Sequence, residues 1–176
     1  MKNPGMPAPA PPQRQGSIRI LHSSDGVAVG EVGPVCIVIW REAVIKARFD
    51  RQVAGLAEVV KRNPEGSCFI CVVEPTAAPP DDKLRKASVE MVASHGEKLK
   101  CVACVIEGSG FRAAVGRSVL SGMALLFGQR ETPLSFFANT SAAARWMAQY
   151  IKINPLEVVK SVETVRKALA PVQARA

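Results

Sequence analysis

The sequence predicts an α/β domain with a mixed β-sheet, an N-terminal antiparallel meander followed by parallel βα units, and helices packed on the sheet. Three short strand-like segments come first, separated by turn residues; strand-like and helical periodicities then alternate. A strand–helix–strand order implies parallel strands joined by right-handed crossovers. The predicted strands are 17–22, 27–32, 35–40, 67–73, 99–106 and 134–138, and the predicted helices are 43–61, 82–95, 111–127, 140–151 and 156–169.

The prediction of an antiparallel meander depends on two turn sequences and on one strand that is apolar throughout. Ser23-Ser24-Asp25-Gly26 and Gly33-Pro34 are typical turn sequences on either side of the alternating segment 27–32. Val35-Cys36-Ile37-Val38-Ile39-Trp40 carries apolar residues on both faces. Strands of that kind lie in the middle of a sheet, so we expect 35–40 to be central.

The helix boundaries follow from capping and breaking residues. Asn63-Pro64-Glu65-Gly66 ends the helix 43–61. Asp81 is expected to be the N-cap of the next helix, because its carboxylate can accept amide hydrogens of the first turn. Gly96 fits the left-handed position after that helix, and Asn139 or Thr140 is expected to cap the helix that ends near Ile151.

Three segments are expected along the chain. Residues 1–16 form a disordered Pro-rich tail, since five prolines remove backbone donors and few large apolar residues are present. Residues 17–152 form the α/β domain. Residues 153–176 form a basic C-terminal helix and tail, whose helix either packs on the domain or serves a partner.

Composition and charge narrow the class of protein. Hydrophobic residues make up 48% of the 176, enough for a core, yet no apolar run approaches the roughly 20 residues of a transmembrane helix. No apolar segment follows the first charged residues, so we expect no signal peptide and a cytoplasmic location. The net charge of +8 divides into +2 in 1–16, +3 in 17–151 and +3 in 152–176. Because the excess lies mostly in the ends, nucleic acid is not expected as a partner.

Four of the five cysteines form a spacing that resembles a zinc site, Cys68-x-x-Cys71 and Cys101-x-x-Cys104. Both pairs fall inside predicted strands, where residues three apart point to opposite faces. One metal ion could not collect both members of a pair. We therefore expect these cysteines to pack in the core as free thiols, and we predict no metal site.

No other motif predicts catalysis. Gly108-Ser109-Gly110 lies between a strand and a helix, but Ala113 replaces the third glycine of a dinucleotide-binding loop. His22 and His95 have no partners in the sequence that indicate a triad. We therefore predict that the protein is not an enzyme and needs no cofactor.

Three stretches of the chain form a recognisable series: Ser67-Cys68-Phe69-Ile70-Cys71-Val72-Val73-Glu74, Lys100 to Glu107 with the following Gly108-Ser109-Gly110-Phe111-Arg112, and Phe136 to Met147. In this order they resemble the STAS and SpoIIAA-like superfamily, the fold of the anti-sigma factor antagonists. The resemblance spans Val35 to Ile151 and implies the same mixed sheet. Relatives that switch partners carry an Asp-x-Ser-Gly turn after the central strand, whereas this chain has Glu74-Pro75-Thr76-Ala77, with Thr76 the one hydroxyl there.

The resemblance implies a non-enzymatic regulatory or scaffolding module of bacterial-type signalling that binds another protein. The expected interaction surface consists of Thr76, Asp81, Asp82, Ser109, Phe111 and Arg112. A second copy of the chain is a further candidate partner. The alternative function is a sensor for a small ligand or lipid, which the apolar segment 111–127 and the apolar cavities of some relatives favour.

Overall fold

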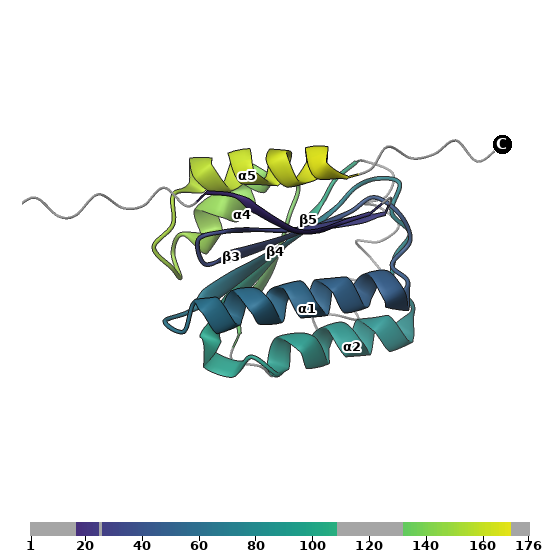
Figure 1. Cartoon of the computed structure of the whole chain (residues 1–176), viewed down its shortest axis with the longest axis horizontal. Coiled ribbons are helices and arrows are strands. Elements are labelled where there is room, and N and C mark those ends of the chain that lie inside the picture. Colours follow the sequence, from purple (N-terminus) through teal and green to yellow (C-terminus); the bar gives the residue numbers. More distant parts are fainter. Residues whose placement is uncertain (1–16, 25, 109–131, 170–176) are drawn as a thin grey trace, which may run out of the picture.

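The computed structural model describes residues 17–24, 26–108 and 132–169. In them the chain forms one six-stranded mixed sheet with the strand order β1-β2-β3-β4-β5-β6 (Figure 1). The first three strands are antiparallel, and β3, β4, β5 and β6 run parallel to one another. The strands are β1 Arg19–Ser23, β2 Val27–Val32, β3 Val35–Trp40, β4 Ser67–Val73, β5 Leu99–Ile106 and β6 Leu134–Phe137. The predicted fold class is therefore confirmed.

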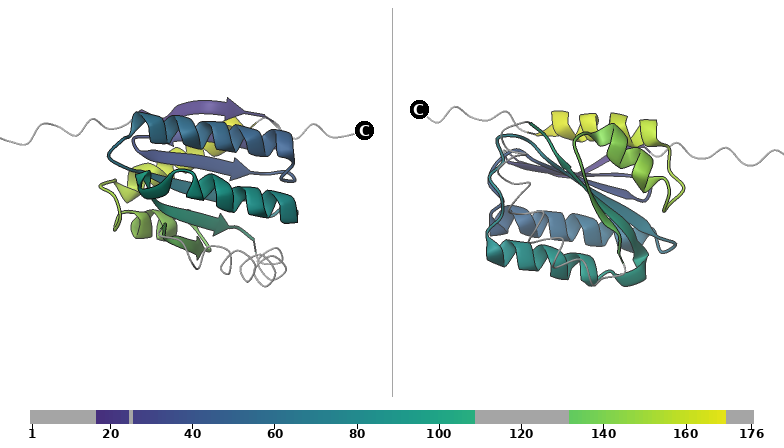
Figure 2. Two further views of the ribbon diagram at one scale, coloured as in Figure 1. Left: turned by 90° about the horizontal axis from the view of Figure 1, so that it is seen from below. Right: turned by 180° about the vertical axis from the view of Figure 1, so that it is seen from behind.

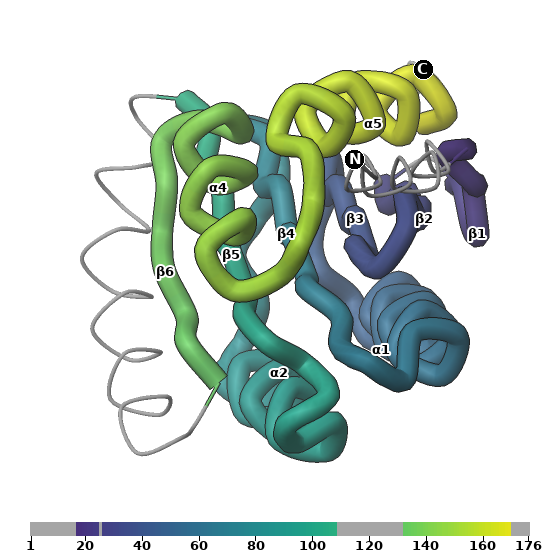
Figure 3. The backbone as a smooth tube through the Cα atoms, turned by 90° about the vertical axis from the view of Figure 1, so that its left-hand side faces the viewer, coloured from purple at the N-terminus to yellow at the C-terminus, as the bar shows by residue number. Residues whose placement is uncertain are grey.

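Helices cover both faces of this sheet. Helices α1 (Lys46–Arg62) and α2 (Asp82–Ala93) lie side by side on one face, and α4 (Thr140–Met147) and α5 (Pro155–Ala168) lie on the other (Figures 2 and 3). A short 3₁₀ turn, η1 (Gly96–Lys98), leads from α2 into β5. Since α1 and α2 each connect neighbouring parallel strands in the same direction along the sheet, right-handed crossovers place them on one face.

The strand alternation divides the core in two. In β3, Val35, Ile37 and Ile39 pack toward α4 and α5, whereas Cys36, Val38 and Trp40 pack toward α1 and α2. All six residues of β3 are buried. The prediction that this strand is central is confirmed, because it has neighbours on both edges and helices on both faces.

The capping residues behave largely as expected, whereas three helices are shorter than predicted, since α2 ends at Ala93 rather than 95 and α4 ends at Met147 rather than 151. Asp81 accepts a hydrogen bond from the Leu84 amide at 2.8 Å, and Asn139 accepts one from the Ala142 amide at 2.9 Å. Gly96 has a left-handed φ of 51°. Helix α1 begins at Lys46 rather than 43, because its N-cap Ile45 has an extended backbone.

Helix α5 packs directly on the meander. Val158, Val162 and Val165 are buried in the same cluster as the apolar residues of β2 and β3. A Cβ atom added to Gly30 in β2 would lie 2.4 Å from Cγ2 of Val165. The absence of a side chain at Gly30 therefore lets the helix approach the sheet closely, and α5 is an integral part of the described core.

Within the described ranges, no helix is long and apolar enough to cross a membrane. The predicted helix 111–127, the Pro-rich tail 1–16 and the end of the C-terminal segment after Leu169 lie outside the described residues.

Candidate functional site

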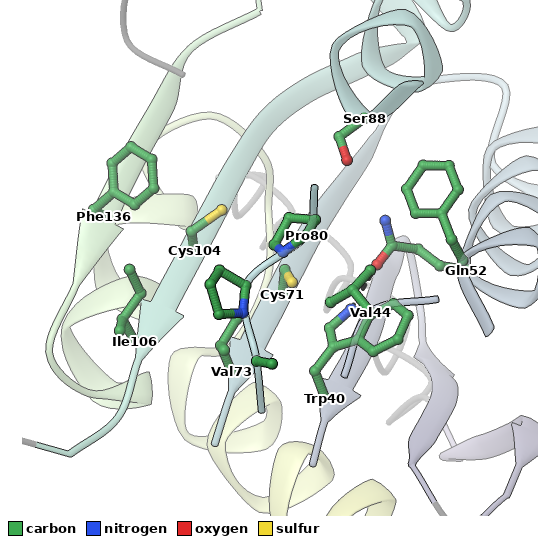
Figure 4. Close-up of a pocket in the computed structure, with 13 residues that line it drawn as sticks. Trp40, Val44, Gln52, Cys71, Val73, Pro80, Ser88, Cys104, Ile106 and Phe136 are labelled. Carbon is green, nitrogen blue, oxygen red and sulfur yellow. Dashed lines mark hydrogen bonds between the residues drawn. The ribbon is translucent and has the colours of Figure 1, made fainter. Parts of the chain in front are cut away.

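An apolar pocket lies between the sheet and the helices α1 and α2, close to the carboxyl ends of the parallel strands (Figure 4). Four strands, two helices and two connecting segments contribute to it. We call it the apolar pocket; its lining residues are Trp40, Val44, Phe49, Gln52, Cys71, Val73, Ala78, Pro79, Pro80, Ser88, Cys104, Ile106 and Phe136.

The position of this pocket follows from the topology. Trp40, Val73 and Ile106 are the last residues of β3, β4 and β5, and the Pro-rich segment after β4 brings Pro79 and Pro80 to the same place. Ligands of open α/β sheets commonly bind beyond the carboxyl ends of the strands. The location is therefore the one where this class of sheet places binding sites.

The apolar pocket is small and uncharged. Its volume is about 100 Å³, and none of the lining residues in the described part of the chain carries a charged side chain. An engineered cavity of about 150 Å³ holds one benzene molecule. The pocket therefore fits a compact group no larger than a small ring, and the greater part of a long acyl chain would remain outside it.

Gln52 and Trp40 form a hydrogen-bonded pair in the wall of the pocket. Both are buried, with 4% and 2% of their surface exposed, and the indole Nε1 donates to Gln52 Oε1 at 2.9 Å. Gln52 was not among the residues predicted from the sequence. It lies between Phe49 and Leu56 on the buried face of α1, and a polar residue at that helical spacing was the signal that could have identified it.

The cysteines divide between the two faces of the sheet, as predicted. Cys68 and Cys101 pack toward α4 and α5, with their Sγ atoms 3.2 Å apart. Cys71 and Cys104 are paired neighbours of β4 and β5 on the other face and line the apolar pocket. Burial raises the pKa of Cys104 to about 12, and burial and the neighbouring Cys104 raise that of Cys71. At neutral pH both are therefore protonated thiols, which are weak nucleophiles.

Across the described part of the chain, no group of three potential metal ligands is found. All five cysteines are free thiols. The opposite orientations of Cys68 and Cys71 explain why the repeated spacing does not converge on one point.

An ion-pair network lies next to the pocket at the carboxyl edge of the sheet. Arg41 Nε donates to Glu74 Oε2 at 2.7 Å, and Arg166 Nη1 of α5 donates to Glu74 Oε1 at 2.6 Å. Arg166 Nη2 also donates to Glu107 Oε1 at 2.8 Å. Burial alone would raise the pKa of Glu74, but the hydrogen bonds from Arg41 and Arg166 outweigh it and hold this pKa below its ordinary value. Glu74 is thus a paired carboxylate at neutral pH, which is a poor proton donor.

The predicted surface residues that the structure describes have local structural contacts. Thr76 Oγ1 donates to the Arg41 carbonyl at 2.7 Å, Asp81 caps α2, and Asp82 forms an ion pair with Arg85. All three are exposed; Thr76 and Asp81 lie between β4 and α2, and Asp82 is the first residue of α2. The other three predicted residues, Ser109, Phe111 and Arg112, lie outside the described residues.

The two histidines lie apart in the fold. His22 is on the edge strand β1, and His95 follows α2 at the start of η1. Burial lowers the pKa of both, assisted by Arg51 at His22. Within the described residues neither forms a hydrogen bond with a carboxylate, so no histidine–acid pair is formed there.

Comparison with known proteins gives no relative: no protein-family model, no curated protein and no solved structure matches this chain. The geometry of the apolar pocket and its surroundings is therefore the basis for assigning a function.

Proposed function

We propose that this domain is a non-enzymatic binding module that holds a small, mainly apolar molecule in the apolar pocket. The observation that carries the proposal is a preformed, uncharged pocket of about 100 Å³ at the carboxyl ends of the parallel strands. Small-molecule sites are typically concave and apolar with a few polar groups, and this pocket has that composition.

The neighbouring chemistry favours binding over catalysis. The two thiols in the pocket, Cys71 and Cys104, have raised pKa values, and Glu74 is held as a carboxylate between two arginines. A catalytic acid or base works best with a pKa near the working pH. The pKa values of these groups are instead shifted away from neutral pH, which supports a site that binds a molecule without reacting with it.

The volume of the pocket also separates the candidate ligands. A long-chain lipid would leave most of its apolar surface in water, because the pocket has room for about one small ring. A compact molecule, by contrast, can be enclosed. We therefore propose a small-molecule ligand rather than a lipid, with a regulatory role that depends on the occupancy of the pocket.

Protein binding at Thr76, Asp81 and Asp82 stays a prediction from the sequence. The side chains of these three residues have partners within their own segment or in the neighbouring strand connection. Those contacts account for the residues without a partner protein, so the pocket is the better supported site.

Benzene is a suitable first probe of the pocket. Titration of the full chain with benzene, followed by methyl NMR shifts, is expected to perturb Val44, Val73 and Ile106. Cys104→Leu would fill the pocket and is expected to abolish these shifts, whereas the matched control Cys104→Ser, which keeps the size of the side chain, is expected to retain them. Absence of binding to the unmodified chain, or equal binding to the Leu variant, would refute the proposal.

A further inference from the structure

The amide of Gln52 has a fixed orientation in the wall of the apolar pocket. Its Oε1 accepts the hydrogen of Trp40 Nε1 at 2.9 Å. An indole nitrogen is only a donor, so the oxygen of the amide must face it and the nitrogen must face the other way. Figure 4 shows this nitrogen turned away from Trp40, toward the side of the pocket where Ser88 lies.

One hydrogen of this amide nitrogen is left without a strong acceptor. In the described part of the chain, the contact that Gln52 Nε2 makes is with the sulfur of Met91, at 3.6 Å. A thioether is a weak acceptor and can take one of the two hydrogens. Gln52 is only 4% exposed, and a buried donor hydrogen without a strong acceptor is rare and destabilising.

Ser88 contributes a second polar atom to the pocket, a hydrogen-bond acceptor, whereas Gln52 Nε2 is a donor. Its hydroxyl donates to the Leu84 carbonyl at 2.8 Å, which uses its single hydrogen and leaves lone pairs on the oxygen. Among the described residues, none that lines the pocket carries a charge. A charged ligand would lose its hydration here without a counter-charge, which is strongly unfavourable. The pocket therefore selects for a neutral molecule.

We infer that the ligand is a neutral, compact molecule with an apolar body and one hydrogen-bond-accepting oxygen, which takes a hydrogen bond from Gln52 Nε2. Small cyclic ketones and lactones have this chemistry. The inference rests on the proposed function and deepens it, because it assigns Gln52 as the residue that determines specificity. Trp40 is the positioning residue, since it holds the amide in the orientation that presents its nitrogen.

Two probes of one shape test this inference. Cyclobutanone and methylenecyclobutane differ in a carbonyl oxygen against a CH₂ group, so the ratio of their dissociation constants isolates the hydrogen bond. Trp40→Phe combined with Gln52→Met removes the donor and leaves no indole hydrogen unpaired. From the unmodified chain to this double variant, the preference for the ketone is expected to fall about tenfold, the equivalent of one hydrogen bond. Trp40→Phe alone keeps the Gln52 amide but removes the hydrogen bond that orients it, so its preference for the ketone is expected to lie between the two.

A measurement on the unmodified chain makes the test independent of how the variants fold. The side-chain amide resonances of Gln52 are expected to move downfield when cyclobutanone is added and to stay in place with methylenecyclobutane. An unchanged ratio in the double variant, or equal amide shifts with both probes, would overturn the inference while leaving the pocket as a binding site. If neither probe nor benzene binds the unmodified chain, the proposed function fails together with the inference.

Discussion

Because α5 approaches β2 closely at Gly30, we expect the effect of Gly30→Ala on stability to change sign when Val165 is replaced by alanine. Gly30 has no positive φ, so alanine is allowed there, and by itself Gly→Ala at such a site stabilises a protein by about 0.4–1 kcal/mol. The added Cβ would, however, lie 2.4 Å from Val165 Cγ2. Overpacking of this kind costs about 1–3 kcal/mol. Gly30→Ala is therefore expected to lower the free energy of unfolding by about 1–2 kcal/mol.

Val165→Ala removes the methyl group that causes the clash. Val165 is fully buried, so this change alone is expected to cost about 2 kcal/mol. In the Val165→Ala background, Gly30→Ala should become neutral or stabilising. The double variant would then be at least as stable as Val165→Ala, which corresponds to a coupling free energy of about 1–2 kcal/mol.

Urea unfolding followed by circular dichroism measures all four members of this cycle. Gly33→Ala is a useful control, because Gly33 has a φ of 52° and nothing within 4 Å of its added Cβ, so its cost comes from the backbone alone and does not depend on Val165. Additive effects of Gly30→Ala and Val165→Ala would show that α5 does not pack on Gly30, and the reasoning would be wrong.

Three further predictions concern buried polar groups. Arg166→Met is expected to lower the free energy of unfolding by about 2 kcal/mol, a value between those of exposed and buried ion pairs. Because the folded pKa of Glu74 is depressed, this loss should be full above about pH 5 and should vanish as the pH falls below the folded pKa. Urea unfolding at several pH values tests this, and a loss that does not depend on pH would contradict it. Within the described residues Ser67 Oγ is buried and has no hydrogen-bond partner, so Ser67→Ala is expected to be neutral or stabilising by up to about 1 kcal/mol in thermal unfolding, and a clear loss of stability would contradict this. The pKa of Cys104 is raised to about 12 in the folded protein, so with rising pH the thiol loses its proton first in the unfolded chain, and the free energy of unfolding should decline from about pH 9 upward. Cys104→Ala should make this decline with pH less steep, and an identical slope in the variant would contradict the raised pKa.

The strands could be predicted from the sequence because they depend on local pattern. Segments 27–32, 35–40, 67–73 and 99–106 match β2, β3, β4 and β5 at both ends, since alternation and flanking Gly, Pro and Asn residues act within a few positions. The opposite orientation of Cys68 and Cys71 followed from the same periodicity.

The pocket and the ion-pair network could not be predicted in this way. Arg166 meets Glu74 across 92 positions of sequence, and Trp40 meets Gln52 only after α1 has folded back on β3. Such pairs depend on sheet order and helix placement, which no short segment encodes. The predicted surface residues came from the ranges 76–82 and 109–112 of the sequence, so they included none of the side chains that line the pocket.

The packing of α5 across the meander also has a consequence for how the chain folds during synthesis. The faces of β2 and β3 that turn toward α5 are strongly apolar, and α5 covers them. Ser23 of the first strand donates a hydrogen bond to the carbonyl of Ala168 in the last helix. A nascent chain therefore leaves the ribosome with one side of its first three strands still uncovered, and that side stays open to chaperones or to aggregation until α5 has been translated.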